Sequence, residues 1–346
     1  MQAYKKKGFW VGLLLFIVCN VLPPPPGLSE SGWVVASVTM LMAAWWATEA
    51  VPVAVTALLP LTLFPLLGVT DIKTAGLPYA NPNIYLFMGG FILALGIEAS
   101  GLHKRLALKM LLLVGNSGAR LVGGFMLVSA LISMWVMNTS TTLMLLPIGL
   151  AVCASVSQTI PDMSSKDRKS FEVALLLGIA YAATIGGMST LVGTAPNIIF
   201  AGFMKETYDI EISFIDWMRL AVPLSFIMLI ASWYALTSIV YPVNFQATEK
   251  TKIKLKSMLD ELGALSKDEK KVLLIFGFAA LAWMFRKLIN LIPGFELLTD
   301  AGVALIAALL FFIIPSKPRF AISDMVFARS GLFINEFIFK ASPSLK

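Results

Sequence analysis

Two runs of uncharged polar residues interrupt long apolar stretches of this sequence. The first run, 138–142, holds one amide and four hydroxyls and lies between two apolar arms, Leu121–Met137 and Thr141–Ser155. The second run, Gly186 to Asn197, mixes glycines, hydroxyls, an amide and a proline within the apolar segment Phe171–Phe203. Uncharged oxygens suit hard cations, and free backbone amides at a helix start attract anions. We therefore expect the two runs to face each other at the membrane midplane and to bind an ion and an anion.

The arms around the first run are each about as long as the shortest helix that crosses a bilayer core of roughly 30 Å. Two arrangements fit them, a pair of ordinary antiparallel helices and a re-entrant hairpin that dips into the membrane and returns. A turn of hydroxyls and an amide, with no charge, glycine or proline, is poor loop chemistry in water, but such backbone is tolerated at membrane depth when it is buried in protein or lines a watery cavity. The run therefore favours the re-entrant hairpin, with the ordinary pair as the alternative.

The segment Phe171–Phe203 is longer than the roughly 20 residues that one helix needs to cross the bilayer. Proline removes a backbone donor and clustered glycines weaken a helix, and both occur between Gly186 and Pro196. We expect this helix to unwind near its middle, where free carbonyls coordinate a cation and a half-helix start attracts an anion. A kinked helix whose glycines allow close packing explains the same residues.

The composition indicates a polytopic membrane protein. Hydrophobic residues make up 58% of the chain, only 14% are charged, and the mean hydropathy is +0.83, whereas about a quarter of the residues of a soluble domain are charged. We predict an all-α fold built from apolar segments that insert wholly or in part into the lipid bilayer. The segments are Gly8–Leu22, Gly32–Thr48, Val51–Leu67, Asn83–Ala99, Leu121–Met137, Thr141–Ser155, Phe171–Phe203, Trp217–Tyr241, Val272–Ile289 and Ala301–Ile314.

Basic residues gather in alternate connections of the chain. The loops that carry Lys104, Lys166 to Lys169, and Lys250 to Lys271 all fall on the same side as Lys5 to Lys7. This positive-inside bias predicts a cytoplasmic amino terminus in the cell inner (plasma) membrane. It also explains the net charge of +7 without a nucleic-acid partner.

The stretch from Thr248 to Lys271 differs from its surroundings. Lys, Asp and Glu alternate there with Leu and Met at helical spacing. The pattern indicates an amphipathic helix on the inner membrane surface, where basic residues meet anionic lipid, or a solvated connector.

The remaining polar residues give no sign of an enzyme. The single histidine, His103, lies beside Lys104 and Arg105 and is expected at a membrane interface, not on a metal ion. Glu49 and Glu98 lie at the ends of apolar segments, where helix capping or solvation explains them. Without a nearby histidine or lysine, no serine or threonine is an activated nucleophile, and no Walker-type phosphate loop is present. We expect no enzymatic activity and no cofactor.

Four stretches together resemble the divalent anion:sodium symporter family, whose members carry dicarboxylates, citrate or sulfate. The stretches are Met42 to Val69, Asn81 to Leu108, Ser133 to Ile148 (SMWVMNTSTTLMLLPI) and Ala180 to Asn197 (AYAATIGGMSTLVGTAPN). The resemblance implies an inverted repeat, a re-entrant hairpin with a Ser-Asn-Thr motif at its tip, and a broken fifth helix that supplies the other wall of a sodium site. It also implies a homodimer whose transport domains move like elevators.

The resemblance assigns residues of this chain to the site, with sodium as the coupling ion and a small dianion as the substrate. The implied sodium ligands are Ser133, Asn138 and the backbone carbonyl of Gly186. The implied substrate contacts are Asn138, Thr139, Gly187 and Thr190. Met137 stands where the family motif has serine. Because a thioether is a poor ligand for a hard cation, the sodium site loses one oxygen at this position.

The same resemblance divides the chain into five parts. They are scaffold and dimerisation helices over 1–120, a transport unit over 121–247, a cytoplasmic amphipathic connector over 248–271, the start of a second repeat over 272–316, and a tail over 317–346 that matches nothing in the family. The family would continue into a second hairpin with a second Ser-Asn-Thr motif, which does not follow here. We therefore expect an incomplete second repeat and little or no transport by the chain as written.

Three functions are weighed for this sequence. The first is a sodium-coupled secondary transporter of C4-dicarboxylate, citrate or sulfate that works by an elevator mechanism. The second is a degenerate, non-transporting membrane subunit or interaction protein, which Met137 and the missing second motif support. The third is an ion channel whose pore is lined by the same polar interruptions, and linear instead of saturating flux would distinguish it.

Overall fold

The computed structural model describes residues 3–113, 117–160, 163–245 and 249–314. Every regular element in these ranges is helical, and five helices are long and apolar enough to cross a membrane. These are Pro82–Ser100, Asn138–Gln158, Ser165–Gly187, Phe214–Val240 and Lys267–Ile289. The predicted all-α, multi-pass membrane fold is therefore confirmed, while the inverted repeat stays a prediction. The tail expected over 317–346 lies outside the described residues.

The described helices form two compact units, and the first ends at Asn81. It contains α1 (Ala3–Val21), α2 (Glu30–Thr48), α3 (Val53–Thr56), α4 (Leu59–Leu66), α5 (Ile72–Gly76) and a 3₁₀ turn (Leu77–Ala80). The apolar segment expected over Val51–Leu67 is divided between α3 and α4. Pro52 immediately precedes α3 and Pro60 lies in the first turn of α4, as is usual for prolines at helix starts.

Helices α1 and α2 lie against each other closely. A Cβ added to Gly12 of α1 would lie 2.8 Å from the indole ring of Trp45 on α2, so the glycine allows this approach. Phe9 stacks on the same indole with ring centroids 5.2 Å apart. The other side of α1 is apolar and open, since Trp10 and Leu14 are more than 60% exposed.

The second unit begins at Pro82 and contains the helices that position the candidate site. They are α6 (Pro82–Ser100), α7 (Leu102–Leu113), α8 (Gly118–Ser133), α9 (Asn138–Thr159), α10 (Ser165–Gly187), α11 (Ala195–Tyr208), α12 (Phe214–Tyr234) with a π-helical continuation (Ala235–Val240), α13 (Glu249–Glu261), α14 (Lys267–Ile289) and α15 (Asp300–Ile313).

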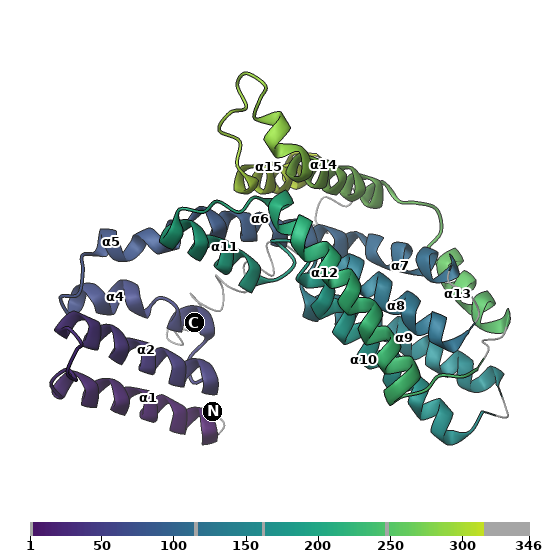
Figure 1. The fold of residues 1–346 in the computed structure, drawn as a ribbon, viewed down its shortest axis with the longest axis horizontal. Helices are drawn as coiled ribbons and strands as arrows, with labels where there is room; N and C mark the ends of the chain where they lie inside the picture. The colour runs from purple at the N-terminus through teal and green to yellow at the C-terminus, as the bar shows by residue number, and fades with distance from the viewer. Residues whose placement is uncertain (1–2, 114–116, 161–162, 246–248, 315–346) are drawn as a thin grey trace, which may run out of the picture. The chain divides into compact units, whose positions relative to one another are not determined.

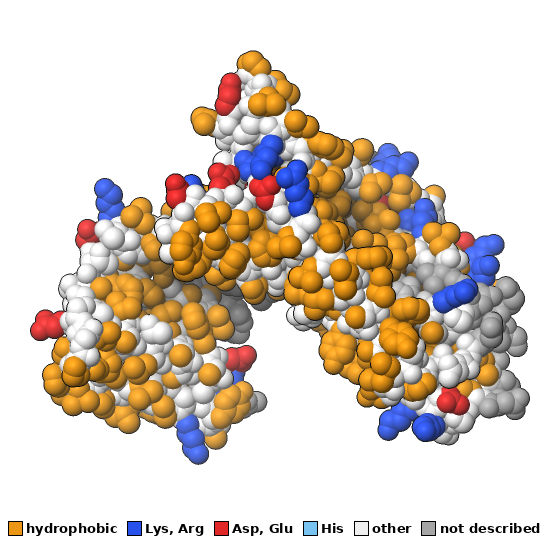
Figure 2. All heavy atoms as spheres, in the orientation of Figure 1, with side chains coloured by type: hydrophobic (Ala, Val, Ile, Leu, Met, Phe, Trp, Pro, Cys, Tyr) orange, Lys and Arg blue, Asp and Glu red, His pale blue; other side chains and the backbone are white. Residues whose placement is uncertain are grey.

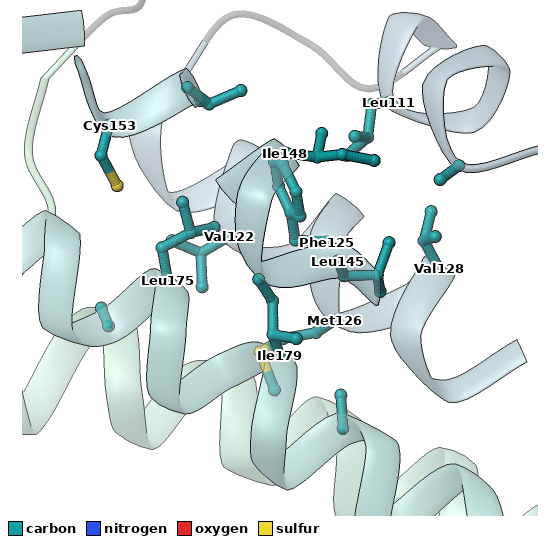
Figure 3. Packing of buried hydrophobic residues seen from close by; sticks show 14 of the residues in the cluster. Leu111, Val122, Phe125, Met126, Val128, Leu145, Ile148, Cys153, Leu175 and Ile179 are labelled. Carbon is teal, nitrogen blue, oxygen red and sulfur yellow. The ribbon is translucent and has the colours of Figure 1, made fainter. Parts of the chain in front are cut away.

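Two apolar cores hold this unit together. Helices α8, α9 and α10 pack side by side around the first core, to which α7 and α13 also contribute (Figure 1). Figure 3 shows Phe125 of α8, Leu145 of α9 and Leu175 of α10 gathered in it. The second core joins α6, α14 and α15, and a Cβ on Gly89 of α6 would lie only 2.7 Å from the backbone of Ala304 on α15.

The outward faces of the helices are strongly apolar. Hydrophobic side chains cover much of the visible surface, including the part over α12, as Figure 2 shows. On α12, Leu220 is 77% exposed and Ile227 is 64% exposed. Such contiguous apolar surface fits contact with lipid and not with water.

The amphipathic stretch expected over 248–271 is divided into two helices. Helix α13 ends at Glu261, and its Leu255 is buried in the first core against α7 and α9. Leu255 therefore packs on protein, while Ile253 of the same helix is 63% exposed, and the expected place on the inner membrane surface stays a prediction. Helix α14 begins at Lys267 with a capping box in which Ser266 and Glu269 satisfy each other's backbone amides.

The start of α14 is fixed by a buried ion pair. Arg105 of α7 and Glu269 have side chains that are 8% and 6% exposed, and Nε of Arg105 lies 2.6 Å from Oε1 of Glu269. The same guanidinium donates to the carbonyl of Gly263 at 2.8 Å and to those of Leu262 and Ala264. This cluster ties α7 to the connection between α13 and α14.

His103 lies inside the protein, and its expected place at the depth of a membrane interface stays a prediction. The residue is only 2% exposed, and its Nδ1 lies 3.1 Å from the carbonyl oxygen of Ile97. Burial lowers the pKa of His103, so the ring is neutral at physiological pH. The helix turn between α6 and α7, at Gly101, folds the ring back against α6, which the charged neighbours in the sequence did not indicate.

Candidate functional site

The first polar run, 138–142, opens α9 and, contrary to the expectation from the sequence, does not form the turn between α8 and α9. Helix α8 ends at Ser133 and α9 begins at Asn138, so 134–137 is the connection. Met137 occupies the N-cap position of α9, where its side chain makes no capping hydrogen bond. The first amides of α9 therefore have no side-chain cap, and the helix start carries partial positive charge.

Hydrogen bonds within the turn orient the side chain of Asn138. Ser133 is fully buried, and its hydroxyl donates to Oδ1 of Asn138 at 2.8 Å. The hydroxyl of Thr141 lies 3.4 Å from the carbonyl oxygen of Val136, which closes the turn from the other side. Asn138 is half-buried, whereas Thr139 is exposed on the first turn of α9.

The second polar run breaks one long helix into α10 and α11. Helix α10 ends at Gly187 and α11 begins at Ala195, so the predicted unwinding is confirmed. The amide of Ser189 donates to the carbonyl of Gly186 at 2.9 Å as the chain leaves α10. Pro196 lies in the first turn of α11, where its missing amide costs nothing.

The two polar runs touch each other directly. A Cβ added to Gly187 would overlap Oδ1 of Asn138, and one added to Gly186 would overlap the backbone of Ala130 on α8. The hydroxyl of Thr190 donates across the gap to the carbonyl of Met134 in the hairpin turn. The turn and the break are therefore in direct contact, as predicted, while their role as a binding site stays a prediction.

Four helix ends meet at this site. The carbonyl ends of α8 and α10 carry partial negative charge, and the amide ends of α9 and α11 carry partial positive charge. The runs 133–142 and 186–197 contain no Asp, Glu, Lys, Arg or His. Among the described residues, no group of three or more His, Cys, Asp or Glu side chains could hold a metal ion. Binding here would depend on uncharged oxygens and helix ends.

An aromatic cluster anchors the hairpin turn. Trp135 stacks near Phe214 of α12 and Trp283 of α14, with ring centroids 5.8 and 6.1 Å away, and meets Phe276 of α14 edge-on at 4.9 Å. Trp217 of α12 donates from its indole to the carbonyl of Met188 in the break at 2.9 Å. No local pattern pairs these rings, because the turn, α12 and α14 lie far apart in the sequence.

Sequence comparison bears on the identity of the chain. Residues 6–326 match the model of a family described as the sodium:sulfate symporter transmembrane region. The chain belongs to the sodium:sulfate symporter family. The predicted family resemblance is thereby confirmed, and because the family consists of symporters, so is the expectation that the chain is not an enzyme.

Individual relatives of this symporter-family chain are transporters by name. It is 37% identical over 318 residues to the sodium-dependent dicarboxylate transporter SdcS of Staphylococcus saprophyticus. It is 36% identical over 314 residues to the protein of the same name from Staphylococcus aureus strain USA300. Each alignment covers 90% of this chain and 60% of the relative. The chain therefore spans about 60% of the length of the curated relatives it matches.

Proposed function

We propose that this chain provides one half of the binding site of a sodium-coupled transporter for small divalent anions. The observation that carries the proposal is the contact of Asn138 Oδ1 with Gly187, where four helix ends meet without any ionised side chain. The printed names of the relatives favour a dicarboxylate as the anion. The family description makes sulfate the alternative, and citrate is a further substrate to test.

The cation part of the site is assigned to Ser133, Asn138 and the carbonyl of Gly186. The hydroxyl and amide oxygens of the first two lie 2.8 Å apart, which is close enough for one ion to contact both. The carbonyl ends of α8 and α10 add favourable partial charge. Buried, preoriented oxygens can replace the water that sodium loses.

The anion part is assigned to Asn138, Thr139, Gly187 and Thr190, beside the amide ends of α9 and α11. Because the two runs hold no lysine or arginine, nothing in them neutralises a dianion outright. Sodium bound next to it would supply that positive charge, so each ligand would favour binding of the other. This mutual dependence is the proposed basis of coupling.

The membrane arrangement follows the same proposal. Helix α8 has 16 residues, which span about 24 Å at 1.5 Å per residue and fall short of a bilayer core. The length of α8 supports a re-entrant hairpin, whereas α9, with 22 residues, is long enough to cross and fits the alternative of two ordinary helices. A homodimer in the plasma membrane, a cytoplasmic amino terminus and an elevator motion complete the proposed transporter.

The decisive experiment is ligand-dependent melting of the purified chain in lipid nanodiscs. We expect sodium to raise the melting temperature relative to choline, and succinate, citrate or sulfate to add to this only when sodium is present. Asn138→Ala should abolish the sodium effect. Asn290→Ala is the matched control, because this amide bonds the carbonyls of Glu296 and Leu298 at the end of α14.

Equal melting of the unaltered chain in sodium and in choline would reject the sodium site. Stabilisation by sodium alone, with no response to any of the three anions, would favour a non-transporting subunit instead.

A further inference from the structure

The break between α10 and α11 is crossed by a side chain to which no role in the site has been assigned. Asn197, the third residue of α11, is 6% exposed. Its Nδ2 donates to the carbonyl of Gly187 at 3.0 Å and to that of Thr190 at 2.7 Å. One amide group thus joins the start of α11 to the end of α10 and to the middle of the loop between them.

Thr190 continues this connection to the hairpin. The residue is fully buried, and its hydroxyl accepts from the amide of Gly193 at 3.1 Å while it donates to the carbonyl of Met134. The chain of contacts therefore runs from α11 through the loop of the break to the turn between α8 and α9.

Gly193 allows the loop to close this tightly. A Cβ at this position would lie 3.0 Å from the carbonyl carbon and Cα of Gly187 and still closer to its oxygen. Any other residue would push the loop away from the end of α10. Asn197, Thr190 and Gly193 hold one compact loop shape between them.

The hydrogen bonds also divide the carbonyls of the break into two kinds. Those of Gly187 and Thr190 accept the strong donors of Asn197, while the carbonyl of Gly186 accepts a backbone amide of the turn that leaves α10. The carbonyls of Gly187 and Thr190 are thus fixed by a side chain, while that of Gly186 is fixed by the backbone and keeps its second lone pair for a cation.

We propose that Asn197 is a positioning residue, which locks the broken helix through Thr190 in the shape that presents the Gly186 carbonyl and Asn138 to one cation. The proposal rests on the proposed sodium site, and it adds that sodium affinity depends on a side chain that does not touch the ion. Without its two donors, the loop 188–194 loosens and the carbonyls of Gly187 and Thr190 become free to turn.

The test compares Asn197→Leu with the unaltered chain in nanodiscs. Leucine branches at Cγ as asparagine does, but it has no hydrogen-bond donor. The sodium concentration that gives half of the maximal rise in melting temperature should increase about tenfold. A change of this size corresponds to the net contribution of about one hydrogen bond to the binding-competent loop shape. Thr190→Val, which removes the next hydroxyl in the chain of contacts, should act in the same direction.

A matched control is Asn20→Leu in α1. The Asn20 amide also makes two hydrogen bonds, to the carbonyl of Phe16 and the hydroxyl of Ser37, each at 2.8 Å. Its loss should lower the melting temperature without moving half-saturating sodium. A role of Asn197 in stability alone would give the same pattern and would overturn the proposal.

Hydrogen exchange separates this proposal from the sodium site itself. In sodium-free buffer, Asn197→Leu should speed exchange of the loop amides 188–194, including Gly193, and leave α14 unchanged. Unchanged exchange of the loop refutes the positioning role whatever sodium does. If Asn197→Leu speeds exchange but the unaltered chain shows no response to sodium, the proposed function is rejected. The claim that the order of the loop sets the sodium affinity is then rejected with it.

Discussion

At the scale of single residues, the contact between Gly187 and Asn138 decides whether the two polar runs act together. The glycine was predicted from the sequence to help unwind a helix, and the structure gives it a second role, since only a residue without Cβ fits against Oδ1 of Asn138. The missing side chain lets the hairpin turn reach the break.

Gly187→Ala should therefore abolish sodium-dependent stabilisation while the fold persists. The added Cβ displaces the side chain of Asn138 from the end of α10. Gly277→Ala is the matched control, because this helical glycine of α14 has no atom within 4 Å of a built Cβ. It should be neutral or stabilising by up to about 1 kcal/mol. Melting with and without sodium checks both, and normal sodium stabilisation of Gly187→Ala would contradict the proposed contact.

Met137 is the residue at which the resemblance leads us to expect a serine. It is 41% exposed at an N-cap position, and its side chain caps nothing. Met137→Ser should stabilise the chain by about 1 kcal/mol through capping of α9. It should also lower half-saturating sodium, because a hydroxyl oxygen replaces a thioether beside Asn138. Met137→Ala removes the sulfur without adding an oxygen. It should neither raise stability in a denaturant titration nor lower the half-saturating sodium concentration in a sodium titration.

At the scale of helices, the places where the sequence predicted well share a physical cause. The ends of α8, α9, α10 and α11 follow from polarity, glycine and proline, which act locally and are visible in a short window. The packing of α13 on α7 and α9 depends on partners far away in sequence, and no local pattern records it. The Asn197 contacts lie between these cases: the residue and its partners belong to one predicted polar run, but the sequence did not show which carbonyls its amide would bind.

The ion pair between Arg105 and Glu269 is the clearest of these distant contacts. The two residues lie 164 positions apart, and both looked like ordinary interfacial charges in the sequence. Glu269→Gln should lower stability by about 3 to 5 kcal/mol, since it leaves a buried guanidinium without its counter-charge. Asp209→Asn is the control, because its pair with Lys205 is exposed and contributes little. Denaturant titration in detergent measures both variants, and a loss as small as that of the control would refute the importance of the pair.

At the scale of the whole molecule, membrane orientation links the charge pattern to the helices. Sequence predicted a cytoplasmic amino terminus from basic residues alone, and this places the start of α14 inside the cell and the loop after it outside. Lys267 is exposed at that start, and Leu297 in the loop is 93% exposed. The native thiols, Cys19 and Cys153, are buried and free, so background labelling should be low.

Single-cysteine labelling in intact cells tests the orientation. Leu297→Cys should react with a membrane-impermeant maleimide added outside, because a crossing α14 carries this loop away from the basic side. Lys267→Cys should react only after the membrane is permeabilised. The opposite pattern would invert the orientation. It would also overturn the assignment of the basic loops around Lys104 and Lys166 to the cytoplasm, because these loops are predicted to lie on the same side of the membrane as the start of α14.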